Sequence, residues 1–114
     1  MHKIVKTEKG YDITLTRGDS LNLVLELKRD GEPYVPDPVA VIRFAMKAKY
    51  KDPDSDVALV KNIPPDTLLL AIEPEDTKGL VMGKSYVYDI QITDEYGYVD
   101  TFIEGRFNIG EEVL

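Results

Sequence analysis

The 114-residue sequence predicts a single all-β domain. Residues 85–109 are predicted to form two long strands joined by a tight turn, because apolar side chains recur at every second position in both arms. A strict period-two stripe of leucines precedes them, at Leu21, Leu23, Leu25 and Leu27. Along the whole chain, about seven such strand patterns follow one another at regular spacing, separated by turn residues.

The hairpin at residues 85–109 is the element that the other strands must pack around. Its first arm carries Tyr86, Tyr88, Ile90 and Ile92 on one face, and its second arm carries Val99, Thr101, Ile103, Gly105, Phe107 and Ile109 on one face. Residues 94–97 join the arms, and Gly97 can take the positive φ that such turns need. Because an isolated hairpin is marginal in water, further strands are required.

The N-terminal part of the chain supplies some of these strands. The lysine-rich residues 1–10 are expected to be a frayed start or an edge strand. Residues 12–16 alternate, with Ile13 and Leu15 pointing inward, and residues 17–20 form a turn that contains the integrin-type tripeptide Arg-Gly-Asp. The leucine stripe is assigned to a strand, since a helix would need apolar residues at i, i+3 and i+4.

Turns and prolines divide the middle of the chain. Residues 29–33 contain an Asp-Gly turn, and prolines keep residues 34–37 extended but outside any central strand. Residues 39–48, 57–62 and 67–72 are predicted strands, and the first carries Ile42, Phe44, Met46 and Ala48 on one face. Residues 73–80 are predicted to form one helical turn, because Pro74 suits its first position and Gly79 its end.

This order of strands favours a β-sandwich of immunoglobulin type, with a small open barrel as the alternative. The domain spans residues 1–114 and its core lies at about residues 11–109. The helical turn lies where such sandwiches cross between sheets, so the hydroxyl of Tyr86 or Tyr88 is expected to bond to the backbone of residues 75–79. The residues expected between the sheets are Leu23, Leu25, Ile42, Phe44, Ile72, Tyr88, Ile90 and Phe107.

Composition and charge exclude several classes of partner. The net charge of −7 opposes binding to nucleic acid or anionic lipid, which both require a positive patch. No apolar run is long enough to span a membrane, and residues 1–10 contain no signal-peptide h-region. The chain has no cysteine, which excludes disulfides and thiolate metal sites. We expect a soluble cytosolic protein, or one assembled into a particle made in the cytosol.

No group of residues predicts catalysis, a cofactor or a metal site. His2 is the only histidine and lies at a terminus, so no histidine-based triad is available. Three aspartates at residues 52, 54 and 56 have the spacing of a calcium loop, but Val57 and Ile63 occupy the positions that need a glycine and a bidentate acid. The acids around Pro74 are expected to cap the helical turn. The protein is therefore interpreted as not an enzyme.

Aromatic residues outside the predicted core are the candidates for a binding surface. Tyr34, Tyr50, Tyr96 and Tyr98 lie in loops or at the hairpin tip, where tyrosine can anchor a loop, contact a protein or stack on a sugar. Tyr98 and Phe102 are predicted on the face opposite Ile103 and Phe107, on a strand at the sandwich edge. The predicted interface consists of Tyr34, Tyr96, Tyr98 and Phe102. The alternative is that Phe102 lies under residues 34–38 and completes the core.

Three segments resemble a known protein family. They are residues 12–23 (DITLTRGDSLNL), residues 70–77 (LAIEPEDT) and the hairpin that begins YVYDIQ at residue 86 and closes on EGRFNI at residues 104–109. They are similar to small immunoglobulin-like proteins of phages and prophages of Gram-positive bacteria, and to the N-terminal domains of tail and baseplate components such as the upper baseplate protein. The resemblance covers roughly residues 11–109.

The resemblance implies a non-enzymatic virion structural or accessory protein of the tail or baseplate. Its partners would be other tail or baseplate proteins or further copies of itself, and it would join the virion in the host cytoplasm. The lack of a receptor-binding or fibre segment after Leu114 departs from the pattern and leaves open a free-standing adaptor or one domain of a longer protein. The alternative function is a carbohydrate- or cell-surface-binding module of immunoglobulin type.

Overall fold

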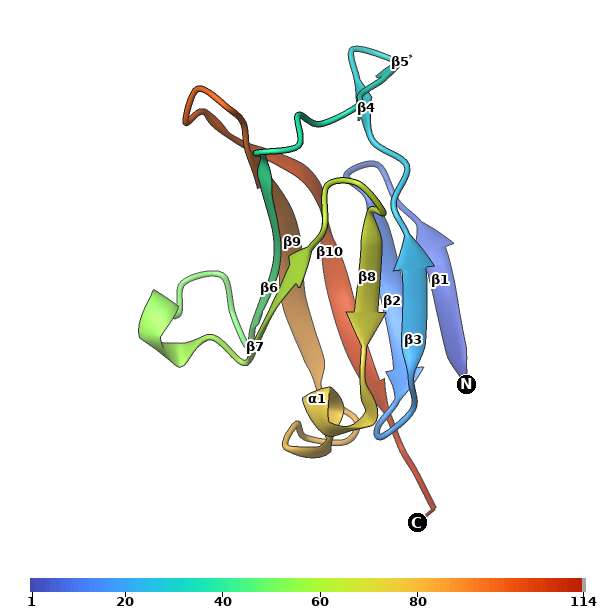
Figure 1. Cartoon of the computed structure of the whole chain (residues 1–114). Helices are drawn as coiled ribbons and strands as arrows, with labels where there is room; N and C mark the ends of the chain where they lie inside the picture. Colours follow the sequence, from blue (N-terminus) through green and yellow to red (C-terminus); the bar gives the residue numbers. More distant parts are fainter. Residues whose placement is uncertain (114) are drawn as a thin grey trace.

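The computed structural model describes residues 1–113 and has an all-β fold with mixed sheets. The predicted domain of residues 1–114 and its tail both end at Leu114, which lies outside the described residues. Within the described chain, helix is limited to α1 (Pro74–Lys78) and to a single 3-10 turn, η1 (Asp54–Asp56). All other regular elements are strands (Figure 1).

A six-stranded sheet, the main sheet, forms the larger layer. Its strand order is β1-β2-β10-β9-β6-β7, and only β2 and β10 run parallel. Its strands are β1 (His2–Lys6), β2 (Tyr11–Thr16), β6 (Val41–Lys47), β7 (Leu59–Ile63), β9 (Ser85–Thr93) and β10 (Val99–Gly110). A second sheet pairs β3 (Leu21–Val24) with β8 (Leu69–Ile72), and a short hairpin pairs β4 (Lys28–Arg29) with β5 (Glu32–Pro33).

The core lies between the main sheet and the β3–β8 pair, which lies in front of β2 and β10 in Figure 1. Residues that lie opposite each other on neighbouring strands share a face of the sheet. Phe44 on β6 and Ile90 on β9 form such a pair, and both point into the core. The rings of Phe44 and Tyr88 stack at a centroid distance of 5.2 Å, and Phe107 meets both of them edge-on. Burial of this apolar surface is the main favourable term in folding.

The core prediction is confirmed in full for six residues, whereas two leucines pack against the core but are not fully buried. Ile42, Phe44, Ile72, Tyr88, Ile90 and Phe107 are buried. Leu23 and Leu25 are only half-buried, because among the described residues no strand pairs with the outer edge of β3. A groove of about 220 Å³ opens there between the leucines and Ile4 of β1.

The predicted hairpin is confirmed as β9 and β10, and the positive φ expected of Gly97 is found at 86°. Its loop is held by Asp94, whose carboxylate accepts the backbone N–H groups of Tyr96 at 2.9 Å and Tyr98 at 3.0 Å. The predicted helical turn is α1, and Glu73 and Asp76 close its N-terminus with a capping box. Residues 1–10 supply an edge strand, β1.

The alternation predicted for the second arm fails at a β-bulge. Thr101 pairs with Gln91 but Ile103 pairs with the next residue along, Ile90, so Phe102 is an extra residue with no partner on β9. Because side chains alternate along a strand, one extra residue moves every side chain on one side of the bulge to the opposite face of the sheet. Thr101 therefore shares the face of Gln91 rather than that of Ile103, which corrects the predicted arrangement.

The position predicted for the second arm is also corrected. β10 is not an edge strand, because it lies between β2 and β9. Its pairing with β2 covers only residues 107–110, with an isolated bridge between Gly10 and Glu104. Residues 99–103 pair on one side only, with β9.

Neither tyrosine hydroxyl bonds to the backbone of residues 75–79 as predicted, but that of Tyr86 bonds to backbone close by. The Tyr86 hydroxyl oxygen accepts the backbone N–H of Val81 at 3.1 Å, just beyond the predicted range of residues 75–79. The hydroxyl of Tyr88 instead donates to the backbone carbonyl of Tyr11 on β2, and burial raises the pKa of Tyr88. These two hydroxyls tie β9 to the loop before it and to the start of β2.

Candidate protein interface

The β9–β10 loop lies at the upper end of the molecule in Figure 1, and this loop and the segments beside it carry exposed apolar residues. Thr93 at the end of β9 pairs with Val41 on one side and with Val99 on the other, and the loop begins directly after it. The segment of residues 34–40 passes at the same end. We call a set of six residues, each between 55% and 86% exposed, the hairpin-end surface: Val35, Val39, Val41, Tyr96, Tyr98 and Val99.

Tyr96 and Tyr98 project from a loop whose backbone is fixed. The backbone N–H groups of Tyr96 and Tyr98 both donate to the Asp94 carboxylate. The Gly97 N–H adds a third hydrogen bond, to the Asp94 carbonyl at 3.0 Å. Tyr96 is 79% exposed and Tyr98 is 74% exposed. A partner could therefore contact large, amphipathic rings without first having to order the loop that carries them.

Tyr34 and Phe102, the other two predicted interface residues, lie against each other. Their rings stack at 5.1 Å, and the guanidinium carbon of Arg29 lies 4.5 Å from the centre of the Tyr34 ring. Arg29 also forms an ion pair with Asp100 at 2.7 Å. Both rings are half-buried and pack against the core, so they anchor the segment of residues 34–40 and the β4–β5 hairpin beside the bulge. This packing favours the alternative interpretation of Phe102.

Acidic groups border the hairpin-end surface. Glu95, in the β9–β10 loop, lies beside Asp37. Desolvation, followed by the neighbouring carboxylates of Asp37 and Asp94, raises the pKa of Glu95. These carboxylates repel one another when ionised. A partner that brings a positive charge to this border would relieve the repulsion.

Sequence reasoning identified the aromatic part of the hairpin-end surface and missed its valines. Val41 and Val99 follow no special motif, but both occupy outward-facing strand positions where a polar residue is usual. Val35 and Val39 flank prolines outside any strand. An apolar residue at an outward-facing strand position and a valine beside a proline are the two signals that could have indicated these residues. Whether any of these residues contacts a partner stays a prediction.

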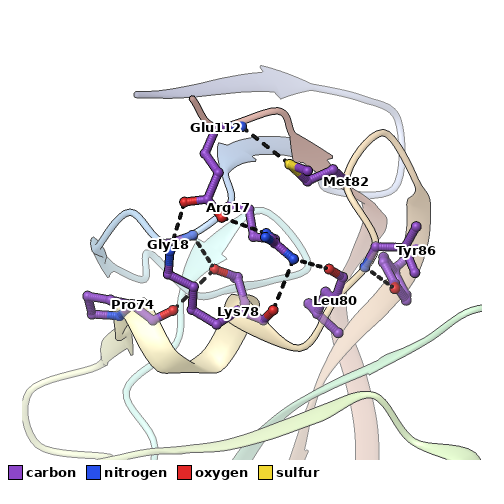
Figure 2. Close-up of polar contacts among 10 residues, drawn as sticks. Arg17, Gly18, Pro74, Lys78, Leu80, Met82, Tyr86 and Glu112 are labelled. Atoms are coloured by element: carbon purple, nitrogen blue, oxygen red, sulfur yellow. Dashed lines mark hydrogen bonds and ion pairs between the residues drawn. The ribbon is translucent and has the colours of Figure 1, made fainter. Parts of the chain in front are cut away.

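The opposite end of the molecule is held by a polar clamp (Figure 2). Arg17 donates from Nε to Glu112 at 2.7 Å and from Nη1 to the Lys78 carbonyl at 3.1 Å. Lys78 donates to the second oxygen of Glu112 at 2.8 Å, and the Gly18 N–H donates to the Thr77 hydroxyl at 2.8 Å. The Arg-Gly-Asp turn is thus part of a structural network that joins β2, α1 and the C-terminal segment.

We expect Glu112→Gln to make stability less dependent on acid pH. Hydrogen bonds from Lys78 and then Arg17 lower the pKa of Glu112 from its usual 4.5. A carboxylate with a lowered pKa stabilises the fold above its unfolded-state pKa and loses that contribution as pH falls through the folded-state pKa. The difference between the denaturation midpoints of wild type and variant should be largest at neutral pH and should disappear at acid pH.

The matched control is Glu111→Gln, since Glu111 is an exposed neighbour of Glu112. Chemical denaturation followed across the acid range provides the measurement. A gap between wild type and Glu112→Gln that stays constant with pH would show that the carboxylate charge is unimportant in the clamp.

The loop that contains Asp52, Asp54 and Asp56 is organised by lysine and backbone groups. Lys47 donates to the Asp54 carboxylate at 2.7 Å and to the Asp52 carbonyl at 2.9 Å.

Over residues 1–113, no three His, Asp or Glu side chains are placed to hold a metal ion. No helix in the same residues is long and apolar enough to cross a membrane. Comparison of the chain with protein-family models, curated proteins and solved structures finds no match.

Proposed function

We propose that this chain is an immunoglobulin-like β-sandwich that serves as a structural or accessory protein of a phage or prophage tail or baseplate. The sequence resemblance over residues 11–109 supports this identity. Three features are in keeping with the fold: a β3–β8 pair facing a larger sheet, a helical turn between β8 and β9, and a tyrosine hydroxyl bonded to upstream backbone.

The protein acts without catalysis, through contacts with other virion proteins and with copies of itself. The observation that carries this proposal is the hairpin-end surface, where valines and tyrosines are left exposed and Asp94 fixes the loop that carries Tyr96 and Tyr98. Exposed apolar clusters of this kind mark protein interfaces, and tyrosine is enriched among the residues that contribute most to binding. The net charge of −7 opposes indiscriminate aggregation, so the association is specific and modest.

The proposed location is the virion, reached by assembly in the host cytoplasm, with neither nucleic acid nor membrane as a partner. Mass spectrometry of particles purified on a density gradient from phage-producing cells tests it. We expect the chain to co-purify with tail and baseplate proteins. Its recovery only from the unassembled fraction would count against a virion role.

The double variant Tyr96→Ser/Tyr98→Ser is expected to stay monomeric at concentrations where the wild type associates, and to keep the wild-type denaturation midpoint. Both rings are largely exposed, and surface substitutions of this kind change stability by about 0.5 kcal/mol or less. Sedimentation velocity at high protein concentration measures the association.

Tyr50→Ser is the matched control, because Tyr50 is also an exposed tyrosine, at 61%, but lies in the loop between β6 and β7. It should associate as the wild type does. A double variant that still associates, or a wild type that stays monomeric and binds no tail or baseplate protein, would contradict the role given to the hairpin-end surface.

A further inference from the structure

The face of the main sheet that points away from the β3–β8 pair carries a polar furrow. Three adjoining hollows of about 300, 130 and 490 Å³ form it. The first and second share Lys47 and Asp89 among their lining residues, and the second and third share Tyr50. The outer furrow, as we call it, is defined by Arg43, Lys47, Tyr50, Asp89, Gln91 and Arg106.

Strand register places these side chains on one face. Arg43 lies opposite Gln91, and Lys47 lies opposite Val87, which in turn lies opposite Arg106. Their neighbours along each strand, such as Ile42, Phe44 and Ile90, point into the core. The backbone groups beneath the furrow are already paired within the sheet, so the furrow offers side chains rather than a free strand edge to a ligand.

Donors and acceptors are interleaved along the furrow. Asp89 is half-buried, accepts a hydrogen bond from the Gln91 amide at 3.3 Å, and has its pKa raised mainly by desolvation. The charge of Lys47 is balanced by Asp54 at 2.7 Å, and Arg106 donates to the Ser85 hydroxyl at 2.8 Å. No single sign of charge dominates the lining, which disfavours a phosphate or another polyanion.

Tyr50 supplies an aromatic surface over the middle of the furrow. The loop between β6 and β7, which projects from the sheet in Figure 1, carries it to the junction of the second and third hollows. Tyr50 lines the third hollow together with Glu104, Gly105 and Arg106 of β10, and desolvation and then the Glu104 carboxylate raise the pKa of its hydroxyl. The residue as a whole is 61% exposed, and the buried Val87 lines the hollow beside it.

We propose that the outer furrow binds a neutral oligosaccharide. Sugar hydroxyls donate and accept hydrogen bonds together, and so need neighbouring acceptors and donors of the kind that Asp89, Gln91 and Arg43 present. The apolar C–H face of a sugar ring packs on an aromatic ring, and in the outer furrow this ring is that of Tyr50. An apolar ligand would leave the polar lining of the furrow unpaired. This site is separate from the hairpin-end surface and does not depend on it.

The test is a titration of isotope-labelled full chain with neutral hexasaccharides of glucose, N-acetylglucosamine, galactose and mannose, followed by amide NMR shifts. At least one probe at millimolar concentration is expected to shift residues 43–50, 87–91 and 104–106. Tyr50→Ala and Gln91→Ala should each weaken that binding by about tenfold, equivalent to about 1.4 kcal/mol. The spectrum of each variant also reports whether it is folded.

Glu111→Ala is the control, because Glu111 is exposed and lies outside both the outer furrow and the hairpin-end surface, and it should bind as the wild type does. The proposal is overturned if none of the probes shifts these residues, or if binding survives both Tyr50→Ala and Gln91→Ala in folded protein. Shifts produced only by polyglutamate or heparin would also overturn it. None of these outcomes bears on association through Tyr96 and Tyr98.

Discussion

Gly105→Ala is expected to lower the free energy of unfolding by about 3 kcal/mol or more, one of the largest effects of any single methyl group in this chain. A Cβ atom at residue 105 would lie 2.1 Å from the backbone carbonyl oxygen of Tyr11 and 2.9 Å from its carbonyl carbon. Backbone atoms cannot rotate away as a side chain can. The start of β2 would have to move off β10, and the bond from Tyr88 to the Tyr11 carbonyl would be strained with it.

Gly79→Ala is the control for this effect. Nothing lies within 4 Å of a Cβ at residue 79, and its φ of −84° suits any residue. Urea denaturation of the two variants should therefore separate the close approach at Gly105 from the general effect of replacing glycine. Similar midpoints for both variants would mean that β2 does not pass over β10 as closely as described.

Phe44→Ala is expected to cost about 3–5 kcal/mol, through lost transfer free energy and the cavity left behind. Phe44 is fully buried on β6, and its ring contacts those of Tyr88 and Phe107. All three rings lie in the middle of the core, where surrounding atoms have little room to collapse into the cavity. Denaturation monitored by far-ultraviolet circular dichroism measures the loss.

Leu25→Ala provides the comparison for Phe44→Ala. A fully buried leucine costs about 2–5 kcal/mol when it is truncated, and the sequence alone predicts that range for Leu25. Because Leu25 is half-buried beside the groove between β1 and β3, we now expect a cost below it. A loss from Leu25→Ala as large as that from Phe44→Ala would show that the groove is closed in solution.

Local patterns in the sequence were sufficient for most strands because each depends on neighbours within a few residues. The alternation of residues 85–93 and the glycine at 97 identify β9 and the turn after it without knowledge of the rest of the chain. The bulge at Phe102 could not be found in this way, since an apolar residue there fits an unbroken alternation equally well. Only the register against β9 shows which face each residue takes.

The candidate surfaces were predictable to the extent that they depend on one segment. Tyr96 and Tyr98 are indicated by their place in a hairpin loop. Val35 and Val39 belong to the hairpin-end surface only because residues 34–40 pass at this end of the molecule, where the Tyr34–Phe102 stack anchors them. The outer furrow depends on the register of several strands together, and no pattern within any one of them indicates it.

The parallel pairing of β2 with β10 has a consequence for the kinetics of folding. The hydrogen bond between the side chains of Thr14 and Asn108 joins residues 94 positions apart, and contacts of such separation require closure of a very long loop. Folds rich in contacts of high sequence separation fold slowly. On the ribosome, β1 and β2 emerge first yet have no place to dock until β10 has been made. We therefore expect the N-terminal strands to be the last part of the domain to become protected from proteolysis during synthesis.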